Sequence, residues 1–236
     1  MTDSAQARRD TLFASIRQSL GRGPLSPDAA RELEGRMARH ERNLQPARSQ
    51  GDRTVLVERF VAMAEAMACS VRSLESADDV PEAVVDYLRA NNLPLSAVLS
   101  PDPELGALPW ADQTLLEVRE GTPANEDLVG VTPAFGAVAE TGTLVMASDE
   151  AHPATLNFLP DHHIVALRRS QIAGSYEDVW DRLRAAQGDN KLPRTVNLIT
   201  GPSRTGDIEL QIHLGAHGPR SLHILLIDDE EGSGRD

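Results

Sequence analysis

Residues 139–143, Ala-Glu-Thr-Gly-Thr, place a carboxylate in a glycine-containing turn between two apolar runs. Glycine lets the backbone approach a ligand closely. A carboxylate at such a turn suits a general base, or a nucleophile toward an acyl carbon. Glu140 is therefore the candidate catalytic residue, with Thr141, Gly142 and Thr143 as candidate ligand contacts. The alternative is a structural carboxylate that accepts hydrogen bonds from the N–H groups of its own turn.

A second polar segment, residues 200–209, follows a buried strand-like run and reads Thr-Gly-Pro-Ser-Arg-Thr-Gly-Asp-Ile-Glu. Exposed N–H groups, hydroxyls and a guanidinium together suit a carboxylate or a phosphate. The acids at the end of the segment suggest the start of a helix. In the alternative interpretation, Asp207 and Glu209 hold Arg204 by ion pairing. Neither GxxxxGK[ST] nor GxGxxG occurs, so no Walker loop or dinucleotide fingerprint is present. The candidate ligand residues here are Gly201, Ser203, Arg204, Thr205, Asp207 and Glu209.

Histidines supply a third set of candidates. His162 and His163 stand directly before an apolar strand, and adjacent side chains of a strand point to opposite faces, so the two do not suit a single metal ion. His163 is a candidate proton carrier or ligand contact, or else a hydrogen-bonded structural residue. His213 and His217 are four residues apart, but the glycines and the proline around them oppose a helix. We therefore expect no metal site, and His217 is retained as a ligand candidate.

The elements that must position these residues alternate along the chain. Apolar spacing predicts helices over 4–20, 28–40 and 54–68. Asp79 is expected to cap a helix over 79–90, and Ser175 begins a capping box for a further helix. Strands are expected at 71–74, 97–99, 115–118, 163–167, 195–199 and 222–227, with two more on either side of the turn at 141–142. Strands alternating with helices indicate an α/β domain with a mainly parallel central sheet flanked by helices. We expect this domain at 51–228, after an N-terminal helical arm at 1–50 and before an acidic tail at 229–236.

The N-terminal arm has little apolar surface of its own. Leu12, Ile16 and Leu20 follow one another at four-residue spacing, and the second predicted helix is mostly polar. Such helices gain their stability by packing against a partner. The partner would be the chain's own domain or a second protomer, so a homodimer is one expectation.

Composition excludes several classes of protein. The 236 residues carry a formal net charge of −13, and the excess of acids lies entirely after residue 50, so the main body would repel a nucleic-acid backbone. The longest apolar runs, such as 224–227, fall far short of the roughly 18 residues of a membrane span. The first ten residues hold no apolar stretch, so we expect no secretory signal and a cytoplasmic location.

The cysteine count restricts redox chemistry. Cys69 is the chain's one cysteine. One thiol cannot hold an iron–sulfur cluster, complete a zinc finger or form an internal disulfide. We expect Cys69 to be a small buried residue and the chain to carry no cofactor of its own.

Read together, the polar segments resemble the lactate-utilisation protein C family, also called the LUD domain family. The matching stretches are AVAETGTLV (137–145), LNFLPDHHI (156–164), NLITGPSRTGDIE (197–209) and LGAHGP (214–219). The resemblance implies a fold akin to that of CoA transferases and ribose-phosphate isomerases. It also implies a part in bacterial oxidation of L-lactate to pyruvate, beside partner proteins that hold the iron–sulfur clusters. The motif positions carried over are Glu140, Thr141, Gly142, Thr143, Ser203, Arg204, Asp207, Glu209 and His217.

Three functions remain open at this point. The first is a non-redox component of an L-lactate utilisation system that binds a small carboxylate or phosphate. The second is a stand-alone enzyme on a CoA ester, a sugar phosphate or a folate-like substrate, in which Glu140 acts as base or nucleophile by analogy with enzymes of that fold. The third is a structural adaptor whose N-terminal helices dock partners.

Overall fold

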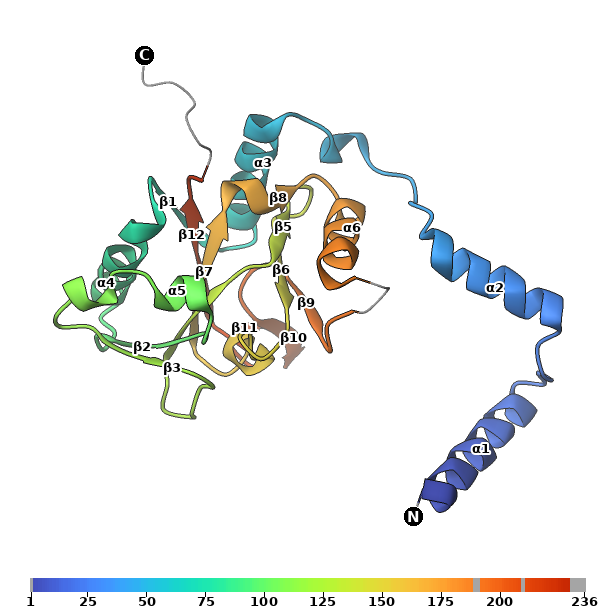
Figure 1. Ribbon diagram of the computed structural model, residues 1–236. Coiled ribbons are helices and arrows are strands. Elements are labelled where there is room, and N and C mark those ends of the chain that lie inside the picture. Colours follow the sequence, from blue (N-terminus) through green and yellow to red (C-terminus); the bar gives the residue numbers. More distant parts are fainter. Residues whose placement is uncertain (1, 189–191, 209–210, 230–236) are drawn as a thin grey trace. The chain divides into compact units, whose positions relative to one another are not determined.

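The computed structural model describes residues 2–188, 192–208 and 211–229, which leaves Glu209 and most of the acidic tail outside the described residues. The chain divides into two units, Met1–Leu44 and Gln45–Asp236. The first unit holds α1 (Thr2–Ser19) and α2 (Pro27–Arg39), both close to their predicted bounds (Figure 1). On α1, Leu12 and Ile16 are 60% and 43% exposed, and Leu20 just after it is 61% exposed, so the apolar stripe has no cover within its own unit.

The second unit is built on a six-stranded, entirely parallel sheet. Its order is β1 (Ser70–Leu74), β12 (Ser221–Ile227), β7 (His162–Arg168), β4 (Val129–Pro133), β2 (Ser96–Leu99) and β3 (Glu117–Glu120). The α/β class and the mainly parallel sheet predicted from the sequence are therefore confirmed. Each predicted strand of this sheet is present, with bounds shifted by at most two residues.

Apolar residues on both faces of the sheet hold its layers together. In β7, Ile164 and Ala166 face a cluster that includes Val84 and Leu88 of α4 (Val80–Ala90). The alternate residues of β7 face a second cluster, which includes Phe60 of α3 (Arg53–Ala66). The two-residue period of a strand explains this division, and burial on both faces explains the continuous apolar runs of the central strands.

A second, four-stranded sheet lies on the α3 side of the unit and was not predicted. Its order is β8 (Ile172–Ala173), β5 (Gly136–Val138), β6 (Thr143–Ala147) and β9 (Val196–Ile199). β5 and β6 are the two strands predicted on either side of the turn at 141–142, and they pair antiparallel. α6 (Tyr176–Gln187) packs its Val179 against this sheet. Ser175 caps α6 in the predicted capping box with Asp178.

Two local predictions were wrong. Residues 204–208 do not begin a helix but form β10 (Arg204–Ile208), which pairs antiparallel with β11 (Gln211–Leu214). Gly206 disfavours a helix there, and the hairpin partner supplies the hydrogen bonds of the extended backbone. Asp79 does not cap α4 through its side chain; it accepts a hydrogen bond from the Ser76 N–H instead.

The remaining elements are short. α5 spans Pro103–Gly106, and five single turns of 3₁₀ helix lie at Ala47–Ser49, Ala77–Asp79, Trp110–Asp112, Ala154–Asn157 and Arg169–Gln171. Within the ranges that the structure describes, no helix combines the length and the apolar character needed to cross a membrane.

Candidate functional site

A cavity of about 280 Å³ lies next to the amino end of β7. We call it the GPSR cavity, after residues 201–204 on its wall. The lining comes from three stretches of the chain: residues 157–158 and 163, residues 198–204, and residues 217–219 with 222. The structure therefore brings together five residues that the sequence singled out: His163, Gly201, Ser203, Arg204 and His217.

The described lining of the GPSR cavity is basic, whereas the chain as a whole is acidic. Among its described residues are the guanidinium of Arg204 and the imidazoles of His163 and His217, but no carboxylate. The whole chain carries a net charge of −13. Because the described lining carries a guanidinium and no carboxylate, the cavity suits a negatively charged ligand.

His163 is fully buried in the wall of the cavity. Its Nε2 lies 2.7 Å from Oγ1 of Thr132, while its Nδ1 is buried without a hydrogen-bond partner in the described part of the chain. Burial lowers the pKa of His163 to about 4, so the imidazole is neutral near pH 7. A buried polar atom without a partner is costly, and a ligand in the cavity would supply the missing hydrogen bond.

His163 does not lie at the edge of the sheet where ligands usually bind. Open α/β sheets bind ligands outside the carboxyl ends of their strands. β7 begins at His162, so His163 lies at the amino end of the strand. The GPSR cavity is thus formed beside the sheet by the loops, not at the usual edge.

Backbone hydrogen bonds fix the loop that forms the cavity wall. The Ser203 N–H donates to the Pro219 carbonyl at 2.8 Å, and the Ser203 hydroxyl accepts from the His217 N–H at 3.3 Å. Arg204 donates one guanidinium hydrogen bond to the Met67 carbonyl at 2.6 Å. A guanidinium has five N–H donors, so this contact orients Arg204 and leaves donors for an anion.

Gly201 has a positive φ of 79°, and a Cβ on it would lie 2.4 Å from the Met67 carbonyl oxygen. Gly142 likewise has a φ of 65°, and its Cβ would lie 2.4 Å from the Ala64 nitrogen. Both glycines are therefore required where turns pack against the end of α3. Close approach of backbone to a ligand is not needed to explain either of them.

Glu140 is not among the residues that line the GPSR cavity. Its Oε1 accepts a hydrogen bond from Nη2 of Arg48 at 2.8 Å, and its side chain is 9% exposed against 67% for that of Arg48. The carboxylate is thus held by an arginine 92 residues away. No local sequence pattern indicates this pair.

A cluster of hydroxyls links the turn of Glu140 to the cavity wall. Thr143 Oγ1 lies within 3.0 Å of three other hydroxyl oxygens, those of Thr141, Tyr176 and Thr200. Thr200 in turn lines the GPSR cavity. The sequence singled out the two threonines of the turn but missed Tyr176, which comes from the first turn of α6.

The other predicted residues lie elsewhere or are not described. Thr205 is buried opposite His213 in the β10–β11 hairpin. Asp207 lies in β10, and its side chain is outside the described residues, as is Glu209. In the described ranges no group of three or more His, Cys, Asp or Glu residues could hold a metal ion.

Comparison with known proteins places the chain in a family. The model of the LUD domain matches residues 57–227. The chain belongs to the LUD domain family. The match contains every described residue of the GPSR cavity, the turn of Glu140, and the six-stranded and four-stranded sheets of the second unit.

Individual relatives of this LUD domain chain match over shorter stretches. A lactate utilization protein C from Macrococcus caseolyticus is 32% identical over 103 residues, which are 43% of this chain and 45% of the relative. The uncharacterized protein YkgG from Escherichia coli is 35% identical over 107 residues, 45% of this chain and 46% of the relative. The matched part therefore spans about half the length of these relatives.

A solved structure supports the fold of this LUD domain chain. The crystal structure of a DUF162 family protein from Deinococcus radiodurans superposes with a TM-score of 0.57 and 19% sequence identity. It covers 75% of this chain and 99% of its own. At that identity the likeness concerns the fold alone.

Proposed function

We propose that this chain is the non-redox component of a bacterial L-lactate utilisation system, and that it binds a small carboxylate or phosphate in the GPSR cavity. In this proposal, iron–sulfur partner proteins oxidise lactate to pyruvate in the cytoplasm. The LUD domain chain holds the anion or organises those partners.

Membership of the LUD domain family supports the pathway, because several similar proteins bear the name lactate utilization protein C. The cysteine count supports the division of labour. Cys69 is buried and is the chain's one cysteine, so an iron–sulfur cluster would need its thiolate ligands from another protein. The exposed stripe of Leu12, Ile16 and Leu20 offers a surface for such a partner or for a second protomer.

The charge of the GPSR cavity is the observation that supports an anionic ligand. Arg204 supplies a fork of N–H donors that matches a carboxylate or a phosphate. The neutral imidazole of His163 supplies one further hydrogen bond at Nδ1, as donor or acceptor according to its tautomer. A short 2-hydroxy or 2-oxo acid would satisfy both groups, and the volume of about 280 Å³ accommodates it.

Growth of a deletion strain tests the pathway. A strain lacking this gene is expected to grow on pyruvate and to fail on L-lactate, and the wild-type gene is expected to restore growth. Normal growth on lactate, with no second lactate dehydrogenase active, would overturn the proposed role. A stand-alone enzyme would then become the first candidate.

Calorimetric titration of the purified chain with L-lactate, pyruvate and inorganic phosphate tests the cavity. Arg204→Gln is expected to weaken binding of the preferred anion at least tenfold, since charge-assisted hydrogen bonds contribute about 1.5–3 kcal/mol. Arg184→Gln is the matched control, because Arg184 makes an ion pair with Asp181 on α6, away from the cavity. If both variants bind the anion with equal affinity, the GPSR cavity is not the binding site.

Glu140→Gln separates the competing functions. If the chain holds an anion or organises partners, this variant is expected to restore growth on lactate as the wild type does. Loss of growth, with an unchanged melting temperature, would instead favour an enzyme that uses Glu140 as base or nucleophile.

A further inference from the structure

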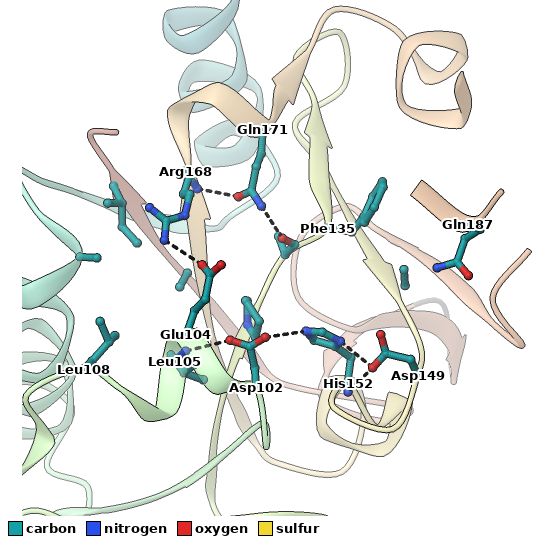
Figure 2. A pocket seen from close by; sticks show the side chains of 16 residues that line it. Asp102, Glu104, Leu105, Leu108, Phe135, Asp149, His152, Arg168, Gln171 and Gln187 are labelled. Atoms are coloured by element: carbon teal, nitrogen blue, oxygen red, sulfur yellow. Dashed lines mark hydrogen bonds and ion pairs between the residues drawn. The ribbon is translucent and has the colours of Figure 1, made fainter. Parts of the chain in front are cut away.

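A second cleft, of about 340 Å³, lies at the opposite edge of the parallel sheet (Figure 2). Its lining includes the last residues of β4, β7 and β12, which are Pro133, Arg168 and Ile227. It also includes Asp102, three residues after the end of β2. The cleft therefore lies at the carboxyl ends of the strands, where open α/β sheets bind their ligands.

The order of the strands explains why the cleft opens there. β2 and β4 are neighbours, but the chain leaves β2 toward β3 at the sheet edge and leaves β4 toward β7 on the other side. Connections that diverge from neighbouring strands leave a crevice between them, the topological switch point of the sheet. We call this site the switch-point cleft.

One part of the cleft carries negative charge around a histidine. Nδ1 of His152 lies 2.7 Å from Oδ1 of Asp149, and Nε2 of His152 lies 3.3 Å from Oδ2 of Asp102. The Asp149 oxygen also accepts from the N–H groups of residues 151 and 152, and Asp102 accepts from the Leu105 N–H. Both carboxylates are thus held in place by backbone donors.

A guanidinium stands on the other side of the same cleft. Arg168 pairs with Glu104 at 3.0 Å, and the side chain of Glu104 is 79% exposed. Ion pairs between such exposed groups contribute little, so a ligand carboxylate can replace Glu104. Gln171 fixes the end of β7, accepting from the Arg168 N–H and donating to the Ala134 carbonyl.

The charged groups of the cleft determine which kind of ligand it can bind. A simple anion would meet the carboxylates of Asp102 and Asp149, and a simple cation would meet the guanidinium of Arg168. A molecule with both charges satisfies both sides. The cleft is also lined by small and apolar side chains, including Ala134, Ala166 and Ile227, which suit a short apolar group.

We propose that the switch-point cleft binds a zwitterionic amino acid. Its carboxylate pairs with Arg168 in place of Glu104, and its ammonium group lies against Asp102 and Asp149. The proposal is independent of the role suggested for the GPSR cavity, because no residue lines both sites.

Calorimetric titration of the full chain tests the charge requirement. The probes are the twenty standard amino acids, then β-alanine and 4-aminobutyrate, which separate the two charges further. For the amino acid that binds best, the analogue lacking the ammonium group and the analogue lacking the carboxylate are both expected to bind at least tenfold more weakly. Failure of every amino acid to bind, or equal binding of a single-charge analogue, would overturn the proposal.

Two variants test the residues. Arg168→Gln and Asp149→Asn are each expected to weaken binding about tenfold or more; the asparagine keeps the oxygen that accepts from the backbone. Arg72→Gln and Asp86→Asn are the matched controls, because these two residues form a half-exposed ion pair outside the cleft. Thermal unfolding shows that each variant is folded. Unchanged affinity in folded Arg168→Gln and Asp149→Asn, or an equal loss in the controls, would refute the assignment.

Discussion

Replacing Arg48 with alanine would leave the carboxylate of Glu140 without the cation that holds it. The Glu140 side chain is 9% exposed and that of Arg48 is 67% exposed, so solvent reaches one partner far more than the other. Removing one partner of a fully buried pair costs about 3–5 kcal/mol, whereas a fully exposed pair contributes about 0–1 kcal/mol. This asymmetric pair lies between these limits. We expect Arg48→Ala to lower the free energy of unfolding by about 1–2 kcal/mol.

A double-mutant cycle isolates the pair. Glu140→Gln keeps the shape of the side chain and removes its charge, so the glutamine no longer needs an arginine. In that background, Arg48→Ala is expected to cost less than about 0.5 kcal/mol, which is typical of a surface substitution. The difference between the two backgrounds is the coupling energy, about 1 kcal/mol, and urea unfolding followed by circular dichroism measures it.

A control and a clear negative result complete this test. Arg184→Ala removes an arginine from a partly exposed ion pair of α6, in which the carboxylate of Asp181 stays 44% exposed, and is expected to change stability by no more than about 1 kcal/mol. If Arg48→Ala costs the same in both backgrounds, the two side chains are not coupled. The reasoning from burial would then be wrong.

Three further perturbations test other contacts of the second unit. Gly142→Ala places a Cβ 2.4 Å from the Ala64 nitrogen at a φ of 65°, so urea unfolding should show that the free energy of unfolding falls by about 2–4 kcal/mol. The control Gly188→Ala has a similar φ of 63° but open space around its Cβ, and should lower the free energy of unfolding by only about 1 kcal/mol. Equal losses in the two variants would rule out the clash. Burial lowers the pKa of His163 from 6.5 to about 4, so the unfolded chain binds its proton first and stability is lost as pH falls from 6.5 toward 4. Between pH 7.5 and pH 5 this amounts to about 2 kcal/mol, and His163→Gln should show a correspondingly flatter pH profile of stability; parallel profiles would contradict the assignment. Ser175→Ala removes the hydroxyl that caps α6 and should lower the free energy of unfolding by about 1 kcal/mol. An unchanged urea midpoint would show that the cap does not stabilise the protein.

The sequence predicted those parts of the fold in which local pattern decides the outcome. The apolar runs of β7 and β12 could be predicted as strands because both their faces are buried. The start of α6 could be predicted because the capping box of Ser175 and Asp178 lies within four consecutive residues. The second sheet was missed because periodicity identifies a strand but not its partner. The β10–β11 hairpin was missed for the same reason: pairing with residues 211–214 outweighed the acids that suggested a helix start.

The residues of the candidate site were likewise predictable only where a local pattern marks them. Gly201, Ser203 and Arg204 were found because they are contiguous, and His163 because it begins an apolar run. Contacts between distant segments left no such signal. The pairing of Arg48 with Glu140 joins residues 92 apart, and the contact of Asp102 with His152 depends on two loops that the parallel sheet brings together.

β7 connects the two cavities that we assign to ligands. His163 near its amino end lines the GPSR cavity, and Arg168 at its carboxyl end lines the switch-point cleft. Five residues of extended strand separate their Cα atoms by roughly 16 Å. The sites are therefore distinct, and their charges favour different ligands. An anion such as lactate would meet two aspartates in the switch-point cleft, whereas an amino acid in the GPSR cavity would find no carboxylate for its ammonium group among the described lining residues. For this reason we expect the two kinds of ligand not to compete, and titration of one in the presence of the other would reveal any shared site.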